Sequence, residues 1–336
     1  TIMQLQGTWA LVIIHKDFPN EIWMSRNGSP LLLGFEDDFV LIVSEQLAFN
    51  NHIKSYIVIE NNDIIHIKKN NKKIEYNENF KRYPVKIKLK DDAIIKPDDF
   101  EHWTLKEIME QPSAIKRCTN NGGRIDDNIS VKLGGLEQNK CRLLECEHII
   151  LLGCGTSYHS SLWSEEIFKS LDIFSTVHVF DGAEFDITDI PKKGKTCIIL
   201  CSQSGETKDL HRCIHIAKEY DLPTIGVVNV VDSLIARDTD CGVYLNAGRE
   251  VAVASTKSFT CQQVALVLFL MWFMENKNIS NFTLNNFYTD LKSLPHNIET
   301  TISSMNNFKH IALNLTKRNN CFILGKNICF NIAQEA

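Results

Sequence analysis

The sequence has no C-x-x-C pair and no set of histidines at the spacing that binds a metal ion. It does contain 11 cysteines among 336 residues, and several of them, such as Cys197 and Cys201, lie inside apolar runs. That placement is typical of reduced, buried thiols, which persist in the cytoplasm. We therefore expect a cytoplasmic protein with no metal site and no tightly bound cofactor.

Nucleotide-binding motifs are also missing or incomplete. No G-x-x-x-x-G-K-[ST] sequence occurs, which argues against a P-loop. Gly153 and Gly155 begin a G-x-G-x-x-G pattern, but Tyr158 stands in place of the third glycine, and G-x-G alone is weak support for a dinucleotide site. A net charge of −5 argues against general nucleic-acid binding. We expect no nucleic-acid partner.

Long apolar runs are absent as well. The longest apolar stretch, residues 264–274, is shorter than the ~20 residues that a membrane-spanning helix needs. The first residues lack the basic start and apolar core of a signal peptide, so we expect no membrane partner. Because the chain begins with Thr1 and residues 331–336 read as the first turn of an unfinished helix, we expect an internal segment of a longer protein.

Two regions with different periodicity follow one another along the chain. Up to about residue 90, strand-like runs separated by turn signals, without crossover helices, predict a mostly antiparallel sheet. These runs cover residues 9–14, 39–43, 56–59, 64–68 and 85–89. A polar stretch follows at 90–97, and then a helical pattern runs from Trp103 to its end at Pro112. We place a domain boundary near residues 90–100.

From about residue 145 the pattern becomes strand–helix–strand. Short apolar strands alternate with amphipathic stretches, which predicts a parallel sheet covered on both faces. The expected strands are 148–152, 176–180, 196–201, 224–229 and 242–246. The helix expected over 258–274 is apolar nearly all round, so it should be buried in the core or an interface. A further strand expected at 321–325 echoes 149–153 and hints at a second copy of the same unit.

Three loops of small hydroxyl residues each lead directly into a helix. They are residues 154–157, 202–207 and 253–257. A helix N-terminus has unpaired N–H groups and partial positive charge, and neighbouring hydroxyls add further donors, so each loop can cradle an anion. Simple N-capping would explain one such loop, but three of them at the carboxyl ends of neighbouring strands should converge on one crevice. The sequence therefore predicts a site for a phosphorylated sugar or polyol.

Single residues near these loops are ambiguous. His159 is either a general acid or base or, the interpretation we favour, a partly exposed helix residue. Lys257 either neutralises a phosphate or pairs with a neighbouring acid. Cys154 sits where a helix N-terminus lowers a thiol pKa, although a small residue in a tight turn is the favoured explanation. Glu206 fits a local role in the first turn of its helix.

Together, these elements resemble the isomerising glutamine–fructose-6-phosphate aminotransferases, over almost the whole chain. The matching segments are 5–10 (LQGTWA), 25–31 (SRNGSPL), 106–112 (KEIMEQP), 154–158 (CGTSY), 202–207 (SQSGET), 246–250 (NAGRE) and 253–257 (VASTK). The resemblance implies an α/β fold, with a flavodoxin-like parallel sheet preceded by the β-rich C-terminal part of an Ntn-type glutaminase domain. The implied domains are the glutaminase part (1–92), a linker and entering helix (93–135), a first sugar-isomerase (SIS) subdomain (136–300) and the start of a second (301–336).

The resemblance also implies an activity and a site. Such proteins take ammonia from glutamine, deliver it to fructose 6-phosphate and form glucosamine 6-phosphate for UDP-N-acetylglucosamine, and we expect a homodimer. The implied phosphate-binding residues are Ser202, Gln203, Ser204 and Thr207. The implied sugar contacts are Thr156, Ser157, Val253 and Ser255. No catalytic residue is expected in this segment: the nucleophilic cysteine would precede it and the catalytic Lys, Glu and His would follow it, so alone it should be inactive. The alternatives are a non-catalytic sugar-phosphate-binding regulator and an isomerase without amidotransfer.

Overall fold

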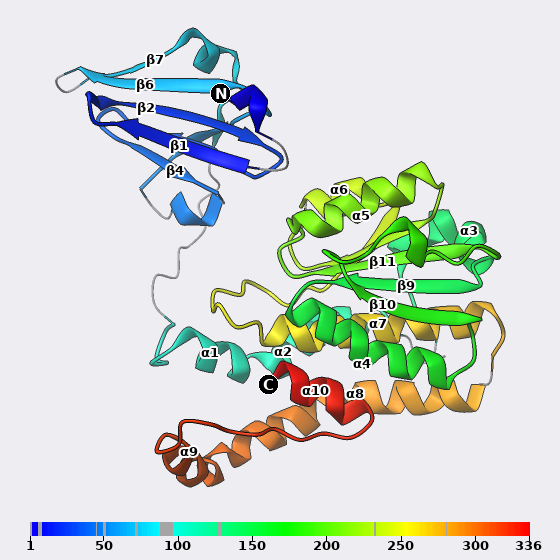
Figure 1. Ribbon diagram of the computed structural model, residues 1–336. Coiled ribbons are helices and arrows are strands. Elements are labelled where there is room, and N and C mark those ends of the chain that lie inside the picture. The colour runs from blue at the N-terminus through cyan, green and yellow to red at the C-terminus, as the bar shows by residue number, and fades with distance from the viewer. Residues whose placement is uncertain are drawn as a thin grey trace. The chain divides into compact units, whose positions relative to one another are not determined.

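The computed structural model divides into two units, Thr1–Lys96 and Pro97–Ala336 (Figure 1). It describes residues 2–336 except 6–8, 45, 50–51, 71–72, 88–96, 126–129, 232 and 280. The division falls within the stretch 90–100 that the sequence analysis proposed as a boundary. The end of the strand predicted at 85–89, most of the polar stretch after it, and the boundary proposed at 92/93 lie outside the described residues.

The first unit consists of two four-stranded antiparallel sheets, which confirms the predicted β-rich fold of this part. One sheet has the order β1 (Trp9–His15), β2 (Phe18–Asn27), β6 (Ile64–Asn70), β7 (Lys73–Tyr76). The other has the order β4 (Val40–Val43), β3 (Leu32–Phe35), β5 (Ser55–Val58), β8 (Lys86–Ile87). Both sheets contribute to one apolar core, which includes Met24, Leu33, Ile57 and Ile65.

The second unit is built on a five-stranded parallel sheet, as predicted. Its order is β10 (Thr176–Asp181), β9 (His148–Gly153), β11 (Thr196–Ser202), β12 (Thr224–Val228), β13 (Cys241–Tyr244). The chain runs from β9 outward to β10 and then returns to the other side of β9 with β11. The strand order therefore reverses between β9 and β11, which is where open α/β sheets bind ligands.

Helices cover both faces of this sheet (Figure 1). The helices on one face are α2 (Gln111–Cys118), α4 (Thr156–Ser170) and α7 (Lys257–Asn276), and those on the other are α5 (Lys208–Glu219) and α6 (Leu234–Asp238). The fully buried β9 and β11 send alternate side chains to the two faces, so the middle of each strand is apolar, and polar residues lie at their ends. A short helix, α3 (Lys140–Leu144), precedes β9.

Helix α7 lies in the core, one of the two locations that its sequence predicted. It is long and apolar enough to cross a membrane, but 78% of its most apolar window is buried inside this unit. Packing against the sheet, α2 and α4 therefore accounts for its composition.

One expectation about secondary structure is confirmed with an addition, and one is wrong. The helix predicted from Trp103, α1 (Trp103–Met109), ends before Pro112, and α2 follows at once with Pro112 in its first turn, where a missing N–H costs nothing. Residues 321–325 form no strand, because none of the described residues offers them a neighbouring strand for hydrogen bonds, and Phe322 and Leu324 are each 90% exposed.

The helices after α7 are α8 (Asn281–Ser303), α9 (Lys309–Leu315) and α10 (Ile328–Glu335). Helix α10 returns to pack against α4, where the side-chain amide of Asn331 donates to the carbonyl of Leu162 at 3.0 Å. The C-terminal residues of the chain are thereby brought to the first turns of α4.

Candidate functional site

One cavity of about 250 Å³ lies where β9, β11 and the segment before α7 end. It brings together all eight residues that the sequence analysis singled out: Thr156, Ser157, Ser202, Gln203, Ser204, Thr207, Val253 and Ser255. Cys154, Glu250 and Ala252 complete its lining. A larger cavity of about 430 Å³ between α2 and α8 contains none of the eight.

The loop after β11 is a sharp turn held by its own hydroxyl groups. The Oγ of Ser202 accepts the N–H of Gly205 at 3.0 Å and shares a hydrogen bond of 2.9 Å with Thr207 Oγ1. The Oγ of Ser204 accepts the N–H of Glu206 at 3.1 Å, so its own proton can still be donated. Gly205 has a φ of +68°, and a Cβ there would lie 2.0 Å from Ser233 Oγ. The turn therefore requires glycine, and α5 begins immediately after it.

Glu206 does not lie in the first turn of α5, where the sequence analysis placed it, because α5 begins at Lys208 with Thr207 as its N-cap. Its Oε1 accepts the N–H of Leu234 at 3.0 Å, at the start of α6. The carboxylate thus joins the loop after β11 to the next helix and does not line the cavity.

The loop after β9 turns directly into α4. A Cβ at Gly153 would lie 2.5 Å from the backbone of Ser157. The end of the strand therefore packs directly against the first helical turn, and this position requires glycine. The Oγ of Ser157 accepts the side-chain amide of Gln262 at 2.8 Å, which ties this turn to α7. The Oγ1 of Thr156 donates to Glu335 Oε1 at 2.6 Å.

Cys154 does not behave as an activated thiol. Burial raises its pKa to about 11, and the nearby carboxylate of Asp181 acts in the same direction. A raised pKa agrees with the favoured explanation, a small residue in a tight turn. His159 is a half-buried residue of α4 whose Nε2 lies 3.9 Å from Glu335 Oε2. That agrees with the favoured interpretation of a partly exposed helix histidine.

The third loop, residues 245–256, has neither helix nor strand. Glu250 organises its second half: Oε1 accepts the N–H groups of Thr256 and Ser258 at 2.9 and 3.2 Å, and Oε2 accepts the hydroxyl of Ser255 at 3.0 Å. The side chain of Val253 is fully exposed. Lys257, just beyond, donates to Glu110 Oε2 at 2.5 Å, and its side chain is 3% exposed. Of its two predicted roles, the structure therefore supports pairing with an acid.

The cavity is polar but has no positive side chain. Among the described residues that line it, the only charged one is Glu250, and hydroxyl groups supply most of the donors. An anion bound here would be held by hydroxyls, backbone N–H groups and the N-terminal ends of α4 and α5. The part of the chain that the structure describes contains no group of three His, Cys, Asp or Glu placed to hold a metal ion.

Three residues of the site were missed by the sequence analysis. Glu335 and Gln262 are 179 and 105 positions away from the residues they bind, and no local pattern connects them. Glu250 lies in the segment NAGRE, which was noted only for its resemblance, and nothing in its spacing showed that it would fold back onto Ser255.

Comparisons with known proteins show what the chain is similar to. Residues 142–272 match the SIS domain. The chain is 39% identical over 327 residues to the probable glutamine–fructose-6-phosphate aminotransferase (isomerizing) of Acanthamoeba polyphaga mimivirus, covering 96% of this chain and 52% of that protein. It is 32% identical to the corresponding protein of Methanococcus maripaludis, again covering 96% of this chain and 52% of the other. The chain thus spans about half the length of the curated relatives it matches.

Solved structures give the same result. The C-terminal domain of glucosamine-fructose-6-phosphate aminotransferase from Francisella tularensis superposes with a TM-score of 0.65 at 25% identity, covering 71% of this chain and 66% of that one. Tagatose-6-phosphate ketose/aldose isomerase from Escherichia coli superposes with a TM-score of 0.52 at 15% identity, covering 70% and 62%, which shows likeness of fold alone.

Proposed function

We propose that the SIS domain of this chain holds fructose 6-phosphate for the reaction of the isomerizing glutamine–fructose-6-phosphate aminotransferases. The chain is a homologue of these proteins over about half of their length. One observation carries the proposal. Residues from three separate loops, chosen from the sequence as ligands of a sugar phosphate, line a single cavity at the point where the strand order reverses.

The phosphate is assigned to the loop after β11. Ser202, Ser204 and Thr207 place three hydroxyls at the N-terminal end of α5, and Gln203 stands beside them. Helix α5 has 12 residues, and the partial positive charge at the N-terminal end of such a helix favours an anion. Hydroxyls can both donate to phosphate oxygens and accept from the backbone, which keeps the turn satisfied when the site is empty.

The sugar is assigned to the other two loops. Thr156 and Ser157 open α4, while Val253 and Ser255 approach from the segment before α7. Their hydroxyls and backbone groups are suited to hydroxyl-rich ligands. Anchoring the phosphate at one end would hold an open-chain sugar in a fixed orientation. A fixed orientation places the carbonyl group for reaction and so lowers the barrier.

In the complete reaction, ammonia from glutamine is transferred to fructose 6-phosphate and the product is isomerised to glucosamine 6-phosphate. We assign residues 1–92 to the end of the glutamine-hydrolysing domain and place the catalytic groups outside this chain. A cytoplasmic homodimer that serves UDP-N-acetylglucosamine synthesis completes the proposal.

Binding to wild-type protein and to a Ser202→Ala/Ser204→Ala variant tests the proposal. Calorimetry should show saturable binding of fructose 6-phosphate and of glucosamine 6-phosphate, and the variant should lose roughly ten-fold or more in affinity. Fructose without phosphate should bind far more weakly. A folded protein that binds neither sugar phosphate would reject the proposed function. Binding without glucosamine 6-phosphate formation by the full-length protein would favour the non-catalytic regulator.

A further inference from the structure

The loop at residues 245–256 borders the cavity, yet apolar packing does not fix its exposed part. Val251 is 38% exposed and Val253 is fully exposed, in contrast to the buried residues that begin at Lys257. A segment without helix, strand or apolar anchor must be held by hydrogen bonds to other elements if it is to present a fixed surface.

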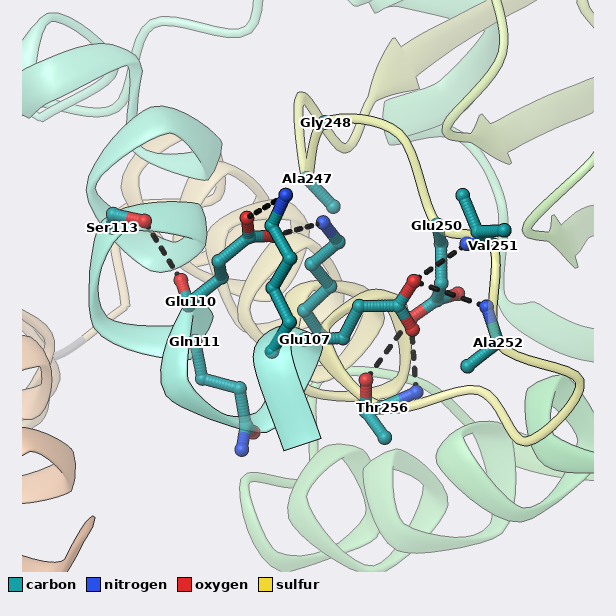
Figure 2. A network of polar contacts seen from close by, with 12 residues as sticks. Glu107, Glu110, Gln111, Ser113, Ala247, Gly248, Glu250, Val251, Ala252 and Thr256 are labelled. Atoms are coloured by element: carbon teal, nitrogen blue, oxygen red, sulfur yellow. Dashed lines mark hydrogen bonds and ion pairs between the residues drawn. The ribbon is translucent and has the colours of Figure 1, made fainter. Parts of the chain in front are cut away.

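Helix α1 supplies those hydrogen bonds at the centre of this segment. Glu107 is 1% exposed, and its Oε1 accepts the backbone N–H of Val251 at 2.6 Å and that of Ala252 at 3.1 Å (Figure 2). A carboxylate that accepts two N–H groups makes two charge-assisted hydrogen bonds, which are about twice as strong as neutral ones. The two residues it holds directly precede Val253.

The same helix also fixes the end of the loop. Glu110, one turn beyond Glu107, accepts Lys257 Nζ at 2.5 Å, where α7 begins. Lys106 of α1 also pairs with Glu110 at 3.8 Å and with Asp98 at 2.6 Å. Glu107 and the C-cap residue Glu110 thus hold the segment before Val253 and after Ser255.

The other oxygen of Glu107 shows which feature of the side chain matters. Its Oε2 is buried and has no hydrogen-bond partner among the described residues. A buried carboxylate oxygen without a partner is costly, so packing alone does not favour glutamate here. The hydrogen bonds of Glu107 are those that Oε1 accepts from the N–H groups of Val251 and Ala252.

We propose that Glu107 is a positioning residue for the sugar end of the cavity, an inference that rests on the proposed function. By fixing the backbone at residues 251 and 252, Glu107 sets where Val253 and Ser255 meet the sugar. The loop after β11, assigned to the phosphate, has no contact with Glu107 in the structure and keeps its own hydrogen bonds. Loss of Glu107 should therefore weaken binding of a phosphorylated sugar without weakening binding of phosphate itself.

The experiment measures the affinity of the full-length protein for two probes, fructose 6-phosphate and inorganic phosphate. Glu107→Ala removes the acceptor, and Glu107→Asp keeps the charge but shortens the side chain so that it cannot reach both N–H groups. Each should lose roughly ten-fold in affinity for fructose 6-phosphate and less than about two-fold for inorganic phosphate. Glu107→Gln keeps the Oε1 acceptor and places its amide where Oε2 has no partner, so it should restore most of the affinity.

Controls separate this inference from its premise and from simple unfolding. Glu101→Ala removes an exposed acidic side chain just before α1 and should change neither affinity. If Glu107→Ala does not fold, judged by circular dichroism and thermal melting, Glu107→Asp carries the comparison. An equal loss for both probes, or wild-type affinity in Glu107→Asp, would overturn the positioning role. Absence of sugar-phosphate binding in the wild type would instead reject the proposed function.

Discussion

Lys257 Nζ and Glu110 Oε2 lie 2.5 Å apart, so the lysine that follows the third hydroxyl loop is engaged with the C-cap residue of α1 and does not line the cavity. The lysine side chain is 3% exposed, whereas the glutamate is 33% exposed. This pairing turns a residue that the sequence offered as a phosphate ligand into a structural link between α1 and α7.

Replacing Lys257 with methionine tests that assignment. The change leaves Glu110 with only the more distant Lys106, and because Glu110 retains access to solvent we expect a loss of about 1–3 kcal/mol in the free energy of unfolding. The affinity for inorganic phosphate should stay within about two-fold. Urea denaturation and calorimetry measure the two quantities, and Lys169→Met, which breaks an exposed pair with Glu165, should cost less than about 1 kcal/mol. Unchanged stability with a large loss of phosphate binding would contradict this assignment.

Gly205 gives a second prediction. Gly205→Ala places a methyl group at a φ of +68° and against Ser233, so we expect at least about 1–2 kcal/mol of destabilisation and much weaker binding of fructose 6-phosphate. Gly134→Ala is a matched control, since no atom lies within 4 Å of the added methyl and its φ is outside the left-handed region. Denaturation curves and binding isotherms of the two variants provide the comparison. Equal behaviour of the two variants would show that the turn after β11 is not fixed as described.

Buried thiols predict how stability depends on pH. Burial raises the pKa of Cys201 and that of Cys213 to about 12 each. The unfolded chain would release these protons near the ordinary thiol pKa of about 8.5, while the folded protein keeps them. Their contribution to stability is therefore complete below about pH 8.5 and is lost as the pH rises toward 12, by up to about 1.4 kcal/mol per pH unit for each thiol.

Denaturation between pH 8 and pH 10.5 measures this slope. Cys201→Ala should have a shallower slope than wild type, because one such proton no longer contributes. Cys321→Ala, which changes an exposed cysteine, should leave the slope unaltered. A wild-type slope in Cys201→Ala would show that this thiol does not resist ionisation in the fold.

Local sequence pattern accounts for most of the second unit. Each strand of the parallel sheet is a short apolar run, and the hydroxyl loops follow β9 and β11, so topology alone brings Thr156 and Ser202 to the same edge. The failure at 321–325 has a physical reason: an apolar run becomes a strand only beside another strand. The helix expected before Pro112 is present, but the pattern did not show that the same proline opens a second helix.

The polar contacts that shape the site could not be predicted in the same way. Glu107 and Val251 are 144 positions apart, and Thr156 and Glu335 are 179 apart. Neither pair is marked by periodicity, spacing or composition, because a hydrogen bond across the fold depends on where two surfaces meet. Sequence reasoning therefore identified residues that line the cavity and missed those that hold the lining in place.

The absence of cationic side chains among the described residues lining the cavity has a kinetic consequence. Lysine or arginine at such a site would draw a dianion from a distance, and salt would screen that attraction. Here the chain carries a net charge of −5, and the attraction comes from neutral donors that act only at contact. A phosphorylated ligand would arrive without attraction to lining cations, at a rate that does not fall as salt is added because salt screens the repulsion by the net negative charge, and selectivity would be expressed in how long it stays.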